Sequence, residues 1–437
     1  MKVLVIGSGA REHAIVVALR RDPQVLQVHA APGNPGIAQL ATCHELAGGV
    51  EDGAGVAKLA RTLGVDLVIV GPEAPLVSGV ADDVRAAGIA CFGPSAPAAR
   101  LEGSKAFAKE VMAAADVPTA QAHVCTDLEQ VMDALDAFGP PYVVKDDGLA
   151  AGKGVVVTDN RSQALAHAAQ CLERQVPPGA PAPQLVIEEY LDGPEISLFC
   201  VTDGTTVLPM APAQDFKRLS DGDEGPNTGG MGAYSPLPWA PEGLVEEVVT
   251  RIAEPTIREL ALRGTPFVGI LYVGLALTSR GLRVVEFNAR FGDPETQVVL
   301  ERLRTPLGGL LYAAATGTLA DLGELTWHDR AAVTVVLAAN GYPGAPRGGD
   351  PITGLEEVDE AASVLHAGTR RAVADGDLLS HGGRVLSVVA SGEDLAQART
   401  RVYEALSHIE LRGSQYRRDI AQAAAAGQVA TPGRVIP

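Results

Sequence analysis

Residues 145–157 read KDDGLAAGKGVVV, and the fold of the middle of the chain depends on what this stretch forms. Gly148, Gly152 and Lys153 nearly meet the spacing of a Walker A phosphate loop, but Gly154 stands where that loop needs serine or threonine. A Walker A loop also leads into a helix, whereas a strand-like apolar run follows here. We therefore predict two strands joined by a glycine-rich loop. Alone, such a loop is equally compatible with a solvated turn and with a mobile cover over phosphate groups.

Lys145 lies on the strand before this loop. Because strand side chains alternate between two faces, Lys145 and Asp147 are expected on one face and Asp146 on the other.

The surrounding residues, about 118–192, predict a small α+β unit inserted in a larger one. Pro118 is expected to end the preceding helix, and the Pro-rich stretch 177–183 reads as a surface connection. Within TDLEQVMDALDAF, Thr126 and Glu129 have the spacing of a capping box, which predicts the start of a helix.

The N-terminal part alternates short apolar strands with helical segments over residues 1–95, which predicts a parallel α/β sheet of Rossmann-like type. The turn GSGARE has Gly7 and Gly9, but Glu12 stands where a dinucleotide fingerprint needs a third glycine. The second strand also lacks the acidic residue that would bind a ribose, so NAD binding is not supported. We interpret the motif as a tight strand-to-helix turn, whose N–H groups can still hold a phosphate.

A hairpin is predicted over residues 269–288, GILYVGLALTSRGLRVVEFN. Strand alternation places Glu286 and Asn288 on one face and turns Val285 and Phe287 to the core. A carboxylate and an amide oxygen at this spacing suit Mg²⁺. The pair alone would be an ordinary polar sheet face, but the charged residues of RFGDPE directly behind it favour a functional site.

Two further segments carry specific expectations. Residues 214–238 show no periodicity and are predicted to form a long loop, either disordered or wrapped around a small polar substrate. Asp293 and Pro294 are predicted as the N-cap and first residue of a helix. The expected domains are an N-terminal α/β domain (1–100), a middle domain with the inserted unit (101–324) and a small, separate α+β domain (325–437).

Composition limits the function. The chain has 437 residues, which suggests three or four folding units, and its net charge of −18 argues against a uniformly basic surface for nucleic acid or membrane binding. Five scattered cysteines predict reduced thiols in the cytoplasm. The N-terminus reads as a first strand rather than a signal peptide, and no apolar run approaches the ~20 residues of a membrane span.

Eleven motifs in order make the chain resemble the phosphoribosylamine–glycine ligase family, and the resemblance covers nearly the whole chain. The motifs are AREH (10–13), VGPEAPLV (70–77), GPS (93–95), LEGSK (101–105), KDDGLAAGKGV (145–155), IEEYLDGPE (187–195), QDFKR (214–218), GPNTGGMGAYSP (225–236), EFNARFGDPET (286–296), HAGT (366–369) and GGRVL (382–386). The resemblance implies an ATP-grasp fold, in which the inserted unit is a lid and ATP lies between the lid and the larger subdomain.

By the same resemblance, Lys105 and Lys145 contact ATP phosphates, Glu188 and the Leu191 backbone meet adenine, and Glu195 meets ribose. The full set implied for ATP is Lys105, Lys145, Gly148, Gly152, Lys153, Gly154, Glu188, Glu189, Leu191 and Glu195. Glu286 and Asn288 are implied as ligands of Mg²⁺ or Mn²⁺.

The implied reaction joins glycine to 5-phospho-β-D-ribosylamine, with ATP converted to ADP and phosphate through a glycyl phosphate, in de novo purine synthesis. Arg290, Lys145 and Lys105 are implied as catalytic. Substrate binding is assigned to Gly9, Arg11, Glu12, Pro72, Glu73, Asp215, Lys217, Asn227, Thr228, Gly229, Gly230, Met231, Arg290 and Asp293. Transient contact with neighbouring purine-pathway enzymes stays open.

The chain departs from the family pattern at several points. Asp146 stands where the family usually has a small residue, and Ser8 and Ala10 replace the usual Asn and Gly of the first turn. Residues 271–277 carry no acid, which leaves the ligands of a second metal ion undefined. The alternatives are another ATP-grasp ligase of purine synthesis, acting on formate or bicarbonate, and an ATP-binding protein without catalysis.

Overall fold

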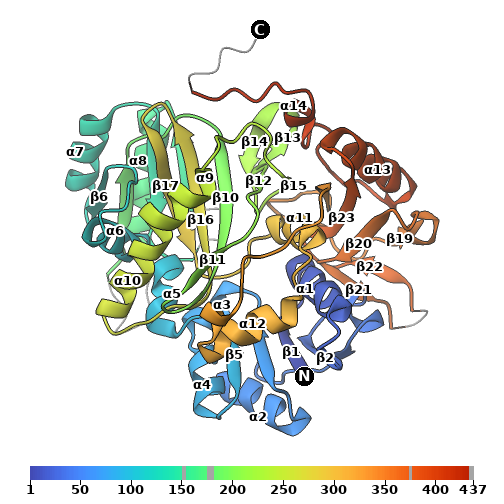
Figure 1. The fold of residues 1–437 in the computed structure, drawn as a ribbon. Helices are drawn as coiled ribbons and strands as arrows, with labels where there is room; N and C mark the ends of the chain where they lie inside the picture. The colour runs from blue at the N-terminus through green and yellow to red at the C-terminus, as the bar shows by residue number, and fades with distance from the viewer. Residues whose placement is uncertain (150–153, 175–181, 374–375, 433–437) are drawn as a thin grey trace.

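The computed structural model describes residues 1–149, 154–174, 182–373 and 376–432. Four sheets of four or five strands organise the described residues, together with three two-stranded sheets, and Figure 1 colours them in chain order. Within the described residues, no helix combines the length and apolar character needed to cross a membrane.

The N-terminal sheet is parallel, with strand order β3-β2-β1-β4-β5, and it confirms the predicted α/β arrangement. β1 and β4 are buried along almost their whole length because helices cover both faces. The elements are β1 (Lys2–Gly7), α1 (Ala10–Arg21), β2 (Gln27–Pro32), β3 (Thr42–Cys43), α2 (Gly53–Leu63), β4 (Leu67–Val70), α3 (Glu73–Val77), α4 (Val80–Ala86) and β5 (Ala90–Phe92).

The lid sheet is antiparallel, with strand order β6-β9-β7-β8, and it projects to one side of the molecule in Figure 1. Its β7 and β8 are the two strands predicted on either side of the glycine-rich loop. Its elements are β6 (Ala122–Cys125), α7 (Leu128–Phe138), β7 (Tyr142–Asp146), β8 (Val155–Thr158), α8 (Arg161–Leu172) and β9 (Leu185–Glu188).

The predicted capping box of α7 is displaced by one residue. Asp127, not Thr126, caps the helix, because its Oδ1 accepts from the Gln130 backbone N–H at 2.9 Å. The Gln130 side chain accepts from the Thr126 backbone N–H at 3.0 Å and so replaces the role assigned to Glu129. Aspartate is preferred over threonine at an N-cap, and the capping-box spacing alone did not distinguish the two neighbouring residues.

The central sheet contains two antiparallel hairpins, in the order β11-β10-β16-β17, and the hairpin predicted over 269–288 is confirmed. The expectation that Val285 points to the core is wrong. Glu286 pairs with Gly274 while Val284 pairs with Leu275, so Val285 is the extra residue of a β-bulge and Val284 takes the core position. The strands are β10 (Glu195–Asp203), β11 (Val207–Pro209), β16 (Val268–Thr278) and β17 (Gly281–Asn288).

The long loop predicted over 214–238 is wrong, because most of it forms four short strands: β12 (Gln214–Asp215), β13 (Arg218–Ser220), β14 (Glu224–Asn227) and β15 (Gly232–Ser235). β12 and β15 join the C-terminal sheet, which has the order β12-β15-β18-β23-β20. This sheet therefore crosses from the middle of the chain into its last third. Its other elements are β18 (Ala331–Ala338), β20 (Ala362–His366), β23 (Arg384–Gly392) and the covering helix α13 (Leu395–His408).

The predicted N-cap at Asp293 is also wrong. Helix α11 (Glu295–Arg302) has Pro294 at its cap position, with no side-chain cap, and the Asp293 carboxylate instead accepts from Gln297 Nε2 at 2.8 Å. Further α-helices and strands are α5 (Ala96–Gly103), α6 (Lys105–Ala114), α9 (Leu244–Val248), α10 (Glu254–Leu262), α12 (Leu307–Thr316), β19 (Ile352–Thr353), β21 (Thr369–Arg371), β22 (Leu378–Ser380), β24 (Glu410–Leu411) and α14 (Gln422–Ala425).

Candidate active site

Two of the lysines assigned to ATP lie where the lid sheet meets the central sheet. Lys145 is buried on β7, with its Nζ 2.7 Å from Glu188 Oε2 and donating to the Val285 carbonyl at 3.0 Å. The β-bulge in β17 supplies that carbonyl, because the extra residue of a bulge is left out of the strand pairing. Lys105, the first residue of α6, donates to the Gly148 carbonyl at 3.0 Å. Both cations therefore border the glycine-rich loop.

The Glu188 carboxylate is not a free hydrogen-bond acceptor, because two lysines already contact it. Its side chain is buried, one oxygen contacts Lys145, and the other lies 3.0 Å from Lys109 Nζ. The carboxylate is thus an ion-pair partner of two lysines. Its predicted contact with adenine remains a prediction.

The other residues assigned to ATP lie at the end of β9, at the start of β10 and in the glycine-rich loop. Glu189 pairs with Arg280 at 2.9 Å, and Glu195 forms a close ion pair with Lys217. Leu191 is half-buried beside them. Gly148 and Gly154 lie at the ends of the loop, whereas Gly152 and Lys153 are outside the described residues.

Glu286 and Asn288 sit on β17 as predicted ligands for a divalent cation. Burial would raise the pKa of Glu286, but Lys217, Lys145 and Lys105 outweigh it and hold that pKa below its usual range. Neither side chain forms a hydrogen bond or ion pair with any residue that the structure describes. An ionised carboxylate and an amide oxygen without protein partners fit Mg²⁺ or Mn²⁺, which take most of their other ligands from phosphates and water.

Asp215 is the most strongly perturbed acid of the site. Burial, reinforced by Glu295, Glu195 and Glu286, raises the pKa of Asp215 to about 8 despite the opposing charge of Lys217. Asp215 thus interacts with three other carboxylates, opposed by Lys217, so a bound cation would be stabilised there.

This perturbation predicts a pH effect on stability. The pKa of Asp215 rises from 3.8 to about 8 on folding, so from about pH 4 to about pH 8 the folded protein keeps a proton that the unfolded chain releases. Stability contributed by Asp215 is therefore lost as pH rises through that window. We expect Asp215→Asn to reduce the fall in Tm of the ligand-free protein between about pH 5 and about pH 9, by roughly 1–3 °C. The exposed Asp133→Asn variant is the control, and equal falls in wild type and Asp215→Asn would contradict the assignment.

Arg290 joins the end of β17 to the N-terminal domain. Its Nη2 lies 2.9 Å from Glu102 Oε1, and its Nε lies 3.4 Å from Glu73 Oε2, at the start of α3 directly after Pro72. Although burial opposes it, the two carboxylates raise the pKa of Arg290 above its usual range. The guanidinium is permanently charged and already shared between two acids, and its role toward substrate stays a prediction.

The predicted N-terminal turn meets the same junction. Arg11 Nε contacts Glu12 Oε1 at 2.6 Å, and its Nη1 donates to the Phe291 carbonyl at 3.0 Å. The other Glu12 oxygen accepts from the Gly9 backbone N–H at 2.6 Å. Glu12 therefore caps its own helix, which explains why glycine is absent from that position.

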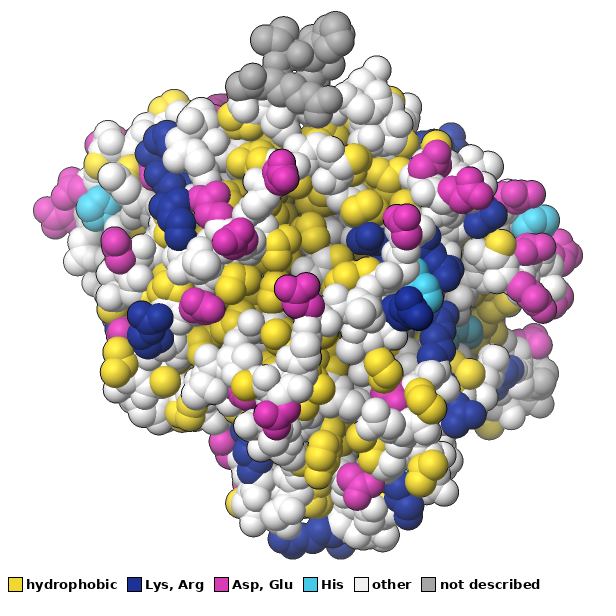
Figure 2. All heavy atoms as spheres, viewed as in Figure 1, with side chains coloured by type: hydrophobic (Ala, Val, Ile, Leu, Met, Phe, Trp, Pro, Cys, Tyr) yellow, Lys and Arg dark blue, Asp and Glu magenta, His cyan; other side chains and the backbone are white. Residues whose placement is uncertain are grey.

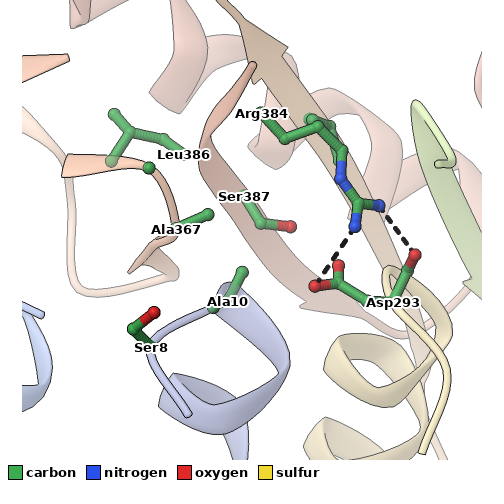
Figure 3. Close-up of a pocket in the computed structure, with 10 residues that line it drawn as sticks. Ser8, Ala10, Asp293, Ala367, Arg384, Leu386 and Ser387 are labelled. Atoms are coloured by element: carbon green, nitrogen blue, oxygen red, sulfur yellow. Dashed lines mark hydrogen bonds and ion pairs between the residues drawn. The ribbon is translucent and has the colours of Figure 1, made fainter. Parts of the chain in front are cut away.

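A cavity of about 240 Å³ lies beside this turn. Figure 3 shows residues from three distant parts of the chain around it, with Ser8 and Ala10 opposite Arg384 and Ser387 of β23. Arg384 Nη1 donates to the Asp293 carbonyl at 2.7 Å, and its Nη2 lies 3.5 Å from the Asp293 carboxylate. Lys and Arg side chains also gather beside a histidine over this part of the C-terminal sheet (Figure 2).

The glycine-rich stretch after β14 is bound to the same arginine. Arg384 Nη1 donates to the Gly229 carbonyl at 2.5 Å and lies 3.4 Å from the Gly230 carbonyl. Thr228 Oγ1 accepts from the Gly230 backbone N–H at 3.0 Å. Asn227 ends β14, and Met231 is buried. The stretch predicted to bind substrate thus contacts Arg384, which lines the cavity.

Two residues of this site were missed. Lys109 lies four residues after Lys105 on the same helix, so a helical period was the available signal. Arg384 belongs to the GGRVL motif, but nothing in the neighbouring sequence indicates that it contacts Asp293 and Gly229. By contrast, Asp146 faces away from Lys145 as alternation predicted, and its carboxylate pairs with Arg174 at 2.6 Å.

A lid sheet that carries Lys145, a central sheet that carries an acid–amide pair, and Lys105 on α6 beside the glycine-rich loop define the ATP-grasp class. The chain belongs to the phosphoribosylglycinamide synthetase family, since models of its N domain, ATP-grasp (A) domain and C domain match residues 1–102, 103–296 and 332–423.

Known proteins agree with this assignment. Phosphoribosylamine–glycine ligase of Streptomyces coelicolor is 64% identical, over 97% of this chain and 100% of its own length. The crystal structure of phosphoribosylamine–glycine ligase from Thermotoga maritima is 32% identical with a TM-score of 0.81, covering 96% of this chain and 100% of that chain. The biotin carboxylase domain of Hydrogenobacter thermophilus 2-oxoglutarate carboxylase, solved with MgADP, shares only the fold, at 16% identity and a TM-score of 0.70, covering 95% and 91% of the two chains.

Proposed function

We propose that this chain joins glycine to 5-phosphoribosylamine with the conversion of ATP to ADP and phosphate, a step of de novo purine synthesis. The observation that carries the proposal is the match of all three family domains in order along the chain. The activity is the one named for a relative that is 64% identical over 97% of the chain.

The nucleotide would lie between the lid sheet and the central sheet. Lys105 and Lys145 carry the positive charge for its phosphates, and the end of β9 with Glu188, Glu189 and Leu191 borders its base. Glu195, the first residue of β10, would contact the ribose hydroxyls. The contacts of Lys105 with the Gly148 carbonyl and of Lys145 with Val285 keep both ammonium groups beside the loop that would cover the phosphates.

Glu286 and Asn288 would hold Mg²⁺ or Mn²⁺. When bound, the ion supplies charge neutralisation for the transferred phosphoryl group. The unpaired carboxylate and amide oxygens described above support this assignment, and the two lysines supply the remaining positive charge from the protein.

Glycine would occupy the region between Asp215 and Arg290. The carboxylates around Asp215 favour an ammonium group, while Arg290 is the residue assigned to a carboxylate or phosphate. A bound ammonium would also lower the pKa of Asp215 and leave it ionised.

The sugar phosphate would enter the cavity beside the N-terminal turn. The walls combine the start of α1 at Ser8 and Gly9 with the cation Arg384, and both features favour an anion. Glu12 is committed to the Gly9 N–H and to Arg11, so it shapes the turn rather than facing an anion.

Two transfers complete the proposed reaction. A glycine carboxylate oxygen attacks the γ-phosphoryl group, ADP leaves, and a glycyl phosphate forms. The amine nitrogen of phosphoribosylamine then attacks the acyl carbon, phosphate leaves with the bonding electrons, and the nitrogen loses a proton. The chain's contribution is to bind and orient the reactants and to exclude water, and positioning of this kind supplies roughly 7–11 kcal/mol in favourable cases.

The five cysteines are all free thiols, which supports a reducing compartment and agrees with the predicted cytoplasmic location. The proposed small-molecule partners are glycine, 5-phosphoribosylamine and ATP, with neither nucleic acid nor membrane. Transient contact with other enzymes of purine synthesis stays a prediction.

An ADP-release assay tests the proposed function. We expect full turnover only when glycine, freshly made phosphoribosylamine and ATP are all present, and a loss of at least about 10²-fold when any one is omitted. Formate and bicarbonate, offered in place of glycine, are the control substrates. ADP formed with either of them and never with glycine would reject the substrate assignment.

A further inference from the structure

Lys109 is a buried lysine on α6 whose ammonium group is completely hydrogen-bonded. Its Nζ contacts Glu188 Oε1 at 3.0 Å, Thr119 Oγ1 at 2.9 Å and the Ala120 carbonyl at 3.0 Å. Thr119 donates its own hydroxyl proton to the Val284 carbonyl at 2.7 Å, so its oxygen accepts from Lys109. Three acceptors require three N–H donors, which only the charged ammonium has. Burial lowers the pKa of Lys109, with Glu188 opposing the shift, but the three hydrogen bonds require the charged ammonium form.

Glu188 connects this charge to Lys145. One carboxylate oxygen of Glu188 contacts Lys109, and the other lies 2.7 Å from Lys145 Nζ. The Glu188 side chain is only 4% exposed. Two cations and one anion leave the three-residue cluster with a single net positive charge. If Lys109 were absent, Lys145 and Glu188 would form a neutral pair.

The cluster joins the parts of the molecule that border the proposed nucleotide site. Lys109 comes from α6, and Lys145 and Glu188 come from the lid strands β7 and β9. The Val285 carbonyl of β17 accepts from Lys145, and the Val284 carbonyl accepts from Thr119, the hydroxyl that Lys109 contacts. Glu286 follows directly on the same strand. The side chain of Lys109 is 12% exposed and its three donors are used, so it acts on a ligand only through Glu188 and Lys145.

We propose that Lys109 is a positioning residue for phosphate recognition: it neutralises Glu188, so that Lys145 presents an unmatched positive charge to the phosphates of the nucleotide. This inference rests on the proposed function, in which Lys145 contacts ATP. The effect of a positioning residue of this kind depends on the charge of the ligand. A residue that only packs the lid would affect charged and uncharged ligands alike.

Comparison of two ligands tests the proposal. We expect Lys109→Met to raise the dissociation constant of Mg-ATP about tenfold, since one unit charge is lost near the phosphates. Adenosine, measured by competition in the same protein, should change less than about twofold because it carries no phosphate. Lys109→Arg keeps the charge and should keep the ratio of the two affinities close to that of the wild type.

Changing Glu188 provides a test in the opposite direction. Glu188→Gln alone removes the negative charge and should strengthen Mg-ATP binding relative to adenosine. The double variant Lys109→Met with Glu188→Gln restores the net charge and should return the ratio toward wild type. Because Glu188→Gln leaves Lys109 in place, the proposal remains testable even if Lys109→Met folds poorly.

Arg280→Met is the matched control. This variant removes the ion pair between Arg280 and Glu189, which also joins the central hairpin to the end of β9. Neither residue of that pair forms an ion pair with Lys145. Its ratio of ATP to adenosine affinity should stay unchanged.

Lys145→Met distinguishes a failure of the role proposed for Lys109 from a failure of the proposed nucleotide site. If Lys145→Met loses ATP preference while Lys109→Met and Glu188→Gln keep the wild-type ratio, the role of Lys109 is overturned and the nucleotide site stands. If Lys145→Met also keeps the wild-type ratio, Lys145 does not contact phosphate, and the assignment in the proposed function fails as well. Equal weakening of ATP and adenosine by Lys109→Met would show a structural role only and overturn the proposal.

Discussion

Glu286→Gln is expected to lower kcat by about 10²–10³-fold and to remove most of the dependence of the rate on Mg²⁺ or Mn²⁺ concentration. Glutamine keeps the size of the side chain but removes the charge that would bind a divalent cation. Tm should fall only slightly, because among the described residues the Glu286 carboxylate has no hydrogen bond or ion pair to lose, only its longer-range attraction to Lys217, Lys145 and Lys105. Steady-state rates over a range of metal concentrations, together with Tm, provide the measurement.

Glu259→Gln is the matched control for this substitution. Glu259 pairs with Arg263 at 2.7 Å on α10, away from β17, so the variant changes one carboxylate to an amide without touching the proposed site. It should keep wild-type turnover and metal dependence. Wild-type turnover in Glu286→Gln itself would remove this residue from the metal site, while a large fall in Tm would show that it serves the fold instead.

The bulge on β17 shows how far local sequence reasoning reaches. Alternating apolar residues and a short turn are local signals, and they predicted the hairpin and the shared face of Glu286 and Asn288. The bulge depends on pairing with Gly274, which no pattern within the strand records. As a result Val285 was assigned to the core, although its carbonyl is what positions Lys145.

Long-range pairing also explains the missed strands in 214–238. β12 and β15 have two and four residues, too few for a period to appear, and they are strands only because β15 pairs with β18. Because no period appeared, the glycines and charged residues of this stretch suggested a loop. The residue types were read correctly, but the partner strand lies about a hundred residues further along the chain.

Site residues divide in a similar way. Lys105 and Lys145 were predicted from motifs that resemble a known family, whereas Glu286 and Asn288 were predicted first from strand alternation and their oxygen donors. Lys109 and Arg384 act through Glu188 and Asp293, and only the folded chain shows these contacts. Residues that position other residues carry weaker local signals than residues that contact substrates.

Arg290→Met is expected to destabilise the protein by about 3–5 kcal/mol, the usual effect of leaving a buried charge without its partner. Glu102 is buried and would lose its ion pair at 2.9 Å, and Glu73 would lose its nearest cation. Because these acids belong to α5 and α3, the contact between the N-terminal part and β17 should weaken. The shift of the urea unfolding midpoint at neutral pH measures the effect, and turnover should fall at least about 10²-fold.

The double variant Arg290→Met with Glu102→Gln separates stability from catalysis. Removing the Glu102 charge should recover much of the lost stability, since the amide can still accept from the Ala289 backbone N–H, which the carboxylate contacts at 2.7 Å. If Arg290 also binds a substrate anion, the stabilised double variant stays inactive, and Arg290→Lys recovers stability better than turnover because lysine lacks the planar fork. Recovery of wild-type turnover together with stability would show that Arg290 only joins β17 to the N-terminal domain, and the substrate anion would then have to be assigned to Arg384 or the lysines.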